Sequence, residues 1–304
     1  MNDLRVEPVA SGNGRRAAKV AAQVLAALLT VGAIGMVFPD LLARLAPPML
    51  FYPEPLSEAE ADPAVWGLAA AESVEVETED GVRLHGWWIP AATGTEPCGA
   101  AIFFHGNAGN IASRSPIGAR LAGLGLSTLL VDYRGYGRSG GKPSEEGLYR
   151  DGRAAYRWVW ERPGVTQGGL IVIGNSLGAA VATDVAASEE TTGLVITGAF
   201  RSVPQMARSI YWWLPAGFFR WSRNRFDSEA RMPDVSVPVL VGRGANDRLI
   251  PRAETRALYE AAAPPKRWVE VEGAGHNDLW LSEGLWMELE KFLDSQLCTG
   301  RTAE

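Results

Sequence analysis

The segment that decides the fold runs from Leu170 to Ala180 and reads L-I-V-I-G-N-S-L-G-A-A. An apolar, β-branched run ends at G-N-S-L-G, and a run of small, helix-forming residues follows it. This order predicts a buried strand, a sharp turn that carries Ser176, and a helix. Gly174 and Gly178 have no Cβ atom, so the strand and the helix can approach closely around that turn. The pattern is typical of a nucleophilic serine, and a chance Gly-Ser turn is the alternative.

Apolar strands alternate with helical stretches along most of the chain. A hairpin is predicted over 74–89, around the turn Asp80-Gly81. Further strands are expected at 100–104, 129–131, 170–174, 194–197, 237–241 and 268–271, and helices around 117–124, after Ser176, and at 144–161, 253–262 and 283–296. Such alternation predicts an α/β fold, a mostly parallel eight-stranded sheet with helices on both faces.

Composition bounds the class of protein. The chain has 304 residues, 47% of them hydrophobic, which is ample for one large α/β domain. Its net charge of -6, with no basic stripe, argues against a nucleic-acid partner. The two cysteines, Cys98 and Cys298, fit no CxxC or zinc pattern, so unpaired structural thiols are favoured. If the domain is exported, a disulfide between the two cysteines is the alternative.

The N-terminal region, 1–46, is expected to be a leader and a membrane anchor. Residues 20–38 carry no charge and follow a basic cluster at 15–19, and that length can span a bilayer as a transmembrane helix. An uncleaved signal anchor is favoured; a cleaved signal peptide and a buried core helix are the alternatives. The positive-inside rule then predicts a single-pass membrane protein whose catalytic domain is exported. Residues 47–70, with four prolines, read as an extended tether, and 71–298 as the globular domain.

A serine hydroxyl needs a base, and the chain has only three histidines. His85 lies in the early hairpin, where the alternation leaves it on a polar face, and His105 opens a Gly-rich turn. His276 lies in G-A-G-H-N-D, in the loop after the last predicted strand. Sites assemble at the carboxyl edge of a parallel sheet, so His276 is the candidate base. We assign no proton-transfer role to His105.

The base in turn needs an acid that holds its tautomer. Asp247 lies just past the preceding strand and is the first choice. Asp278 is the rival, but it is only two residues from His276. Asp132 also ends a strand, and there a structural role in holding the following loop is favoured.

An oxyanion intermediate needs two fixed N–H donors. One is expected from the backbone of Leu177, directly after the nucleophile. The other is expected from the turn that His105 opens, with the N–H of Asn107 preferred and that of Ala108 as the fallback.

Five motifs together resemble the α/β-hydrolase superfamily. They are F-F-H-G-N-A-G-N (103–110), D-Y-R-G-Y-G-R-S-G-G (132–141), G-N-S-L-G (174–178), G-x-N-D-x-x-I-P (244–251) and G-A-G-H (273–276). The order Ser176, Asp247, His276 is the order of that superfamily. The nearest branch is similar to serine hydrolases with one N-terminal membrane segment, whose eukaryotic relatives include lysophospholipid lipases and protein depalmitoylases.

The resemblance implies esterase, lipase or thioesterase chemistry through an acyl-enzyme, with no cofactor and no metal. The expected substrate is a small-molecule or lipid acyl ester. A peptidase of the same fold is one alternative, although we identify no pocket for a free amine. A non-catalytic binding protein on the same fold is another.

In this superfamily an insertion after the sixth strand commonly forms a cap over the nucleophile. The corresponding segment of this chain is 201–234. Here aromatic side chains crowd around Pro215 and Gly217, with arginines between them. We expect a short helical lid that faces the bilayer, in which Trp212, Trp213 and Phe219 bind the acyl chain. The alternative is that these aromatic residues complete the core.

Overall fold

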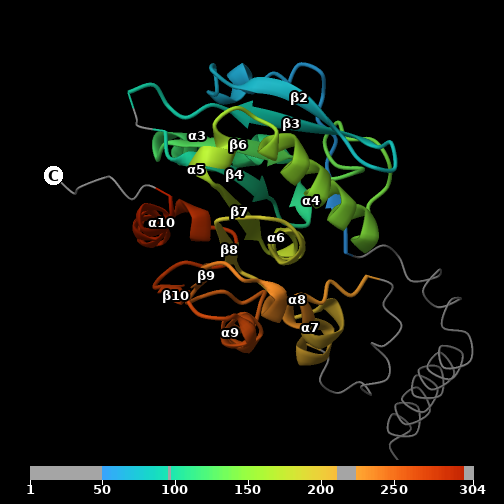
Figure 1. Ribbon diagram of the computed structural model, residues 1–304. Coiled ribbons are helices and arrows are strands. Elements are labelled where there is room, and N and C mark those ends of the chain that lie inside the picture. Colours follow the sequence, from blue (N-terminus) through green and yellow to red (C-terminus); the bar gives the residue numbers. More distant parts are fainter. Residues whose placement is uncertain (1–49, 95–96, 211–223, 298–304) are drawn as a thin grey trace, which may run out of the picture.

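The structure is a computed structural model that describes residues 50–94, 97–210 and 224–297. Its centre is an eight-stranded sheet with the strand order β10-β9-β8-β7-β4-β6-β3-β2 (Figure 1). The strands are β2 (Glu72–Glu77), β3 (Arg83–Ile89), β4 (Gly99–Phe104), β6 (Leu126–Val131), β7 (Leu170–Asn175), β8 (Gly193–Thr197), β9 (Val239–Gly244) and β10 (Lys266–Val271). Six strands run parallel, while β3 pairs antiparallel with both β6 and β2. The predicted mostly parallel sheet is confirmed.

Helices cover both faces of this sheet (Figure 1). The α-helices are α3 (Ser115–Gly123), α4 (Glu145–Trp160), α5 (Val165–Gly168), α6 (Leu177–Ser188), α7 (Val203–Ile210), α8 (Ser228–Arg231), α9 (Arg252–Ala261) and α10 (Glu283–Gln296). Short elements are β1 (Tyr52–Pro53), β5 (Ala108–Gly109) and the 3-10 turns η1 (Pro63–Trp66), η2 (Ile111–Arg114), η4 (Met232–Asp234) and η5 (Leu279–Leu281).

The strands divide the core into two apolar layers. On β4, Ile102 and Phe104 pack with the layer beneath α4, α6 and α9, whereas Ala101 and Phe103 pack with the layer beneath α3 and α10. Successive side chains of a strand point to opposite faces, so a continuous apolar run such as 100–104 fills both layers. This double burial fixes the register of β4 in the centre of the sheet.

The segment expected as an extended tether is packed against the domain over its described part, 50–70. Phe51, Leu56 and Leu68 are buried in the core, and β1 pairs in parallel with β5. Residues 50–70 therefore pack as part of the globular domain. Pro53 and Pro55 lie in bridged positions, opposite Gly109 and Gly137, and the apolar side chains of this stretch pack against residues that lie far away in sequence.

Three other expectations concern residues at the edges of the described part. No helix among the described residues is both long and apolar enough to cross a membrane, and the predicted anchor at 20–38 lies outside them. Of the predicted lid, α7, α8 and η4 are described, while Trp212, Trp213 and Phe219 lie outside. The expectation of an unpaired thiol is wrong for Cys98, which is disulfide-bonded; the chain's other cysteine, Cys298, lies outside the described residues.

Candidate active site

Ser176 occupies the turn between β7 and α6 with φ 54° and ψ -115°. A positive φ is costly for a residue with a side chain, and such strain is typical of a serine that a tight strand–helix turn pushes outward. The turn is possible only because of its glycines. A Cβ atom on Gly174 would lie 2.3 Å from the carbonyl oxygen of Gly178, and one on Gly178 would lie 2.0 Å from that of Phe104.

The loops after β9 and β10 bring together the predicted acid and base. His276 Nδ1 lies 2.7 Å from Oδ2 of Asp247, and both side chains are nearly buried. The other carboxylate oxygen, Oδ1, accepts hydrogen bonds from the backbone N–H groups of Leu249 and Ile250, each at 2.9 Å. The rival acid, Asp278, instead accepts a hydrogen bond from the N–H of Gly275 at 2.6 Å.

These contacts set the charge of the acid. Burial raises the pKa of Asp247, but the hydrogen bonds from His276, Ile250 and Leu249 outweigh it and hold that pKa below its ordinary value. Asp247 therefore stays ionised at neutral pH, where its charge favours a proton on the facing Nδ1 of His276. That leaves Nε2 as the ring atom able to accept a proton.

Ser176 and His276 border the same strand end. The N–H of Ser176 donates to the carbonyl of Thr197, the last residue of β8, at 2.8 Å. A Cβ atom on the next residue, Gly198, would lie 2.9 Å from Cε1 of His276. Ser176, which follows β7, and His276, which follows β10, thus both lie near the carboxyl end of β8, and Asp247 follows β9, the strand between β8 and β10.

The turn after β4 lies directly beside the nucleophile. A Cβ atom on Gly106 would lie 3.6 Å from Cβ of Ser176. Leu177 is the first residue of α6, and N–H groups of a first helical turn have no partner within the helix. The two predicted oxyanion donors, Asn107 and Leu177, therefore belong to the two segments that adjoin Ser176.

Three successive carbonyls of this turn are held in place. Tyr133 donates its hydroxyl to the carbonyl of His105 at 2.8 Å, and Nδ1 of His105 lies 2.7 Å from that of Gly106. The carbonyl of Asn107 accepts from the Tyr136 hydroxyl and from the Tyr52 N–H, each at 2.9 Å. Since a carbonyl and the following N–H share one rigid peptide plane, these bonds also fix the N–H groups of the turn.

We name residues 50–56 the N-terminal strap, because they lie across this turn and the loop after β6. The side chain of Asn107 donates to the carbonyl of Leu50 at 3.2 Å. The N–H of Glu54 donates to the carbonyl of Gly109, and its carbonyl accepts from the N–H of Gly137. Sequence reasoning missed the strap, since most of its bonds use backbone atoms. The two tyrosines that hold the turn, Tyr133 and Tyr136, belong to the motif D-Y-R-G-Y-G, and that motif was the signal in the sequence that could have indicated their role.

No group of three or more metal-ligating side chains gathers anywhere in the described ranges. The described part of the predicted lid holds a cavity of about 310 Å³ lined by Arg201, Gln205, Arg208 and Ser209. Arg201 is engaged there, because its guanidinium group pairs with the buried Glu254. What the site offers is a strained serine, a carboxylate–imidazole pair and fixed backbone donors.

Comparisons with known proteins agree with this geometry. Residues 95–227 match the family model described as serine aminopeptidase, S33. The chain is 40% identical over 236 residues to the uncharacterised protein Rv2307c of Mycobacterium tuberculosis, covering 77% of this chain and 83% of that protein. It is 30% identical to the α/β hydrolase domain-containing protein WAV2 of Arabidopsis thaliana, covering 73% and 78% of the two chains.

Among solved structures, the Pyrococcus furiosus esterase Pf2001 superposes with a TM-score of 0.65. The alignment covers 81% of this chain and 99% of the esterase, at 22% sequence identity. At that identity the likeness establishes the fold.

Proposed function

The chain belongs to the α/β-hydrolase superfamily and is a serine hydrolase, and from this premise we propose that it cleaves carboxylic esters or thioesters of acyl groups through an acyl-enzyme on Ser176. The observation that carries the proposal is the hydrogen bond between His276 and Asp247, in loops that adjoin the strand end beside Ser176. A strained serine next to a buried imidazole–carboxylate pair is the arrangement that acyl transfer requires.

In the proposed reaction His276 Nε2 takes the proton of Ser176 as its oxygen attacks the acyl carbonyl. Asp247 stabilises the imidazolium that forms. The N–H groups of Asn107 and Leu177 stabilise the oxyanion. His276 then returns the proton to the leaving alcohol or thiol, and water releases the acid by the same steps in reverse.

We further propose that the enzyme is anchored by residues 20–38 and that its catalytic domain is exported. The uncharged segment and the basic residues before it support an anchor of this orientation. The disulfide at Cys98 supports the export, because disulfides persist mainly in oxidising compartments.

A peptidase is the second candidate function, because the matching family model is described as a serine aminopeptidase. An aminopeptidase needs a carboxylate that faces the free amine of its substrate. The cavity in the described part of the predicted lid is lined by two arginines, a glutamine and a serine, and Gln205 there donates to the carboxylate of Glu229 at 2.7 Å.

The test is a fluorophosphonate probe followed by a substrate panel. Full-length protein should be labelled, and Ser176→Ala should abolish the label. Ser188→Ala is the matched control, since that hydroxyl donates to the carbonyl of Asp184 at the end of α6. Acyl esters and thioesters of increasing chain length, together with aminoacyl amides, then separate the two functions. Faster cleavage of the amides would replace the esterase proposal with the peptidase.

A further inference from the structure

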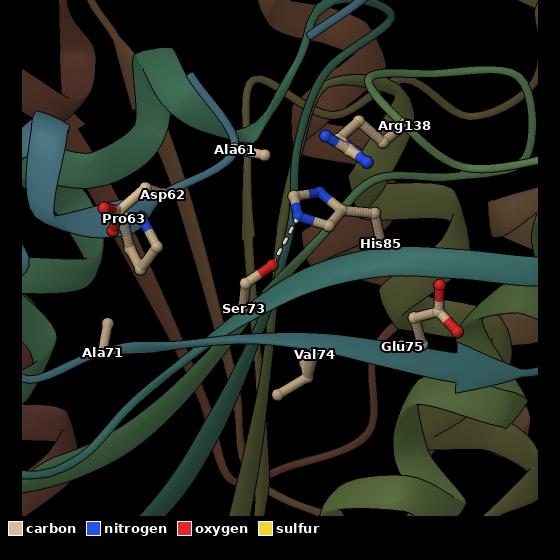
Figure 2. Close-up of a pocket in the computed structure, with 9 residues that line it drawn as sticks. All are labelled: Ala61, Asp62, Pro63, Ala71, Ser73, Val74, Glu75, His85 and Arg138. Carbon is tan, nitrogen blue, oxygen red and sulfur yellow. Dashed lines mark hydrogen bonds between the residues drawn. The ribbon is translucent and has the colours of Figure 1, made fainter. Parts of the chain in front are cut away.

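A second polar pocket lies away from Ser176, beside the edge strands β2 and β3 (Figure 2). Its volume is about 390 Å³, within the range of small-molecule sites. Three of its polar residues, Ser73, His85 and Arg138, point toward one another (Figure 2). The proposed reaction uses none of them.

His85 is the buried centre of this group. Sequence alternation placed it on a polar face, but its side chain is only 8% exposed, because the loop after β6 covers it. Its Nε2 lies 3.0 Å from the hydroxyl oxygen of Ser73. Its Nδ1 is buried without a hydrogen-bond partner in the described part of the chain, and it lies 3.9 Å from Oδ2 of Asp132.

Asp132 lies behind the ring. It is fully buried, and its Oδ1 accepts from the N–H of Ile111 at 2.9 Å and lies 3.3 Å from Nε2 of His105. Its Oδ2 has no hydrogen-bond partner within the described residues. A proton on Nε2 of His85 would be donated to the hydroxyl oxygen of Ser73, which lies 3.0 Å away. The hydroxyl proton of Ser73 is then free to point into the pocket, where it suits an anion.

Arg138 supplies the matching positive charge on the other side. It is exposed, and it pairs with no carboxylate among the residues that the structure describes. The two carboxylates that line the pocket point away from the group (Figure 2): Asp62 accepts from the N–H of Ala64, and Glu75 lies 3.8 Å from Arg83. A guanidinium fork beside a hydroxyl donor matches the two oxygens of a carboxylate.

We propose that this pocket binds a short aliphatic monocarboxylate through Arg138, Ser73 and His85. Apolar groups of Ala61, Pro63, Ala71 and Val74 form the remaining walls and suit a short alkyl chain. Two carboxylates in the lining, with Asp132 behind, disfavour a dianion such as phosphate. Under the proposed function, and resting on it, the acid product of ester hydrolysis belongs to this same class of ligand.

The binding test does not depend on activity. Full-length protein carrying Ser176→Ala is titrated with butyrate while the imidazole proton signals are followed by NMR. The chain has only three histidines, so the signals of His85 and His276 can be assigned by substituting each in turn. Saturable movement of the His85 signals is expected, and Arg138→Gln should weaken it about tenfold or more.

Arg83→Gln is the matched control, because that arginine lies two residues from His85 and pairs with Glu75 outside the group. It should leave butyrate binding unchanged. Ser73→Ala should weaken binding without moving the unfolding temperature. Movement of the His276 signals alone, equal effects of the two arginine substitutions, or binding of inorganic phosphate as tight as that of butyrate would each overturn the proposal. Loss of the esterase activity would not.

Discussion

The imidazole of His276 and the carboxylate of Asp247 meet at 2.7 Å between Nδ1 and Oδ2. The second oxygen of that carboxylate is held by two backbone N–H groups, those of Leu249 and Ile250. The carboxylate therefore cannot rotate away from the ring without breaking three hydrogen bonds. In the proposed mechanism, a base that is fixed in this way presents a single ring nitrogen to the serine.

Replacement of Asp247 by Asn should reduce kcat for ester hydrolysis by about 10³- to 10⁴-fold, because an amide no longer selects the tautomer of His276. Stopped-flow or steady-state kinetics on an activated ester would measure this. The control is Asp278→Asn, which removes a loop contact to Gly275 and should cost about tenfold at most. A greater loss in the control than in Asp247→Asn would reverse the assignment of the acid.

The strap gives a sharper test of the oxyanion turn. Tyr52→Pro removes the N–H that donates to the carbonyl of Asn107, whereas Tyr52→Ala keeps the N–H and removes only a half-exposed ring. Loosening the turn should lower kcat about tenfold with little change in KM, less than the ~10²- to 10³-fold of a deleted donor. Equal kinetics in the two variants would show that the strap does not position the turn.

The sheet could be predicted from sequence because its strands are apolar runs bounded by Gly, Pro and Asp. The elbow at Ser176 could be predicted for the same local reason. The strap could not: the donor of Tyr52 and the acceptor of Asn107 are backbone atoms that every residue type carries. The burial of His85 could not be predicted either, because it depends on a loop that begins 47 residues later at Asp132. Local patterns specify elements, whereas these contacts arise only when distant segments meet.

The elbow glycines should be indispensable for folding. Gly178→Ala would place a methyl group 2.0 Å from the carbonyl oxygen of Phe104, in the middle of the sheet. We expect a loss of about 3 kcal/mol or more in the free energy of unfolding, measured by urea denaturation. Gly123→Ala at the end of α3 meets nothing within 4 Å and should be neutral or stabilise by up to about 1 kcal/mol. Similar midpoints for both variants would contradict the packing argument.

Acid should weaken the native state partly through Asp247. Its folded pKa lies below the ordinary value of 3.8, so its contribution to stability is present above pH 3.8 and is lost as pH falls through the folded pKa. Thermal unfolding followed from about pH 5 to about pH 2 should therefore show a smaller acid-induced drop for Asp247→Asn than for the parent. An identical drop would mean that the hydrogen bonds to this carboxylate contribute nothing to folding.

Chain-length selectivity tests the predicted lid. If Trp212, Trp213 and Phe219 contact the acyl chain, each polar replacement removes apolar surface that a long chain buries and an acetyl group does not reach. At about 0.8 kcal/mol per buried methylene, losing contact with two methylenes lowers kcat/KM about tenfold or more for a dodecanoyl ester. The kcat/KM for acetate esters should change less than about twofold, because an acetyl group is too short to reach the lid in the parent or in the variant.

Trp66→Ser is the matched control, since that indole lies on η1, is 38% exposed and donates to the carbonyl of Glu60. Equal losses of activity on both esters would contradict the lid and would favour a role of the three aromatic residues in the core, because a packing defect lowers the amount of active enzyme for every substrate.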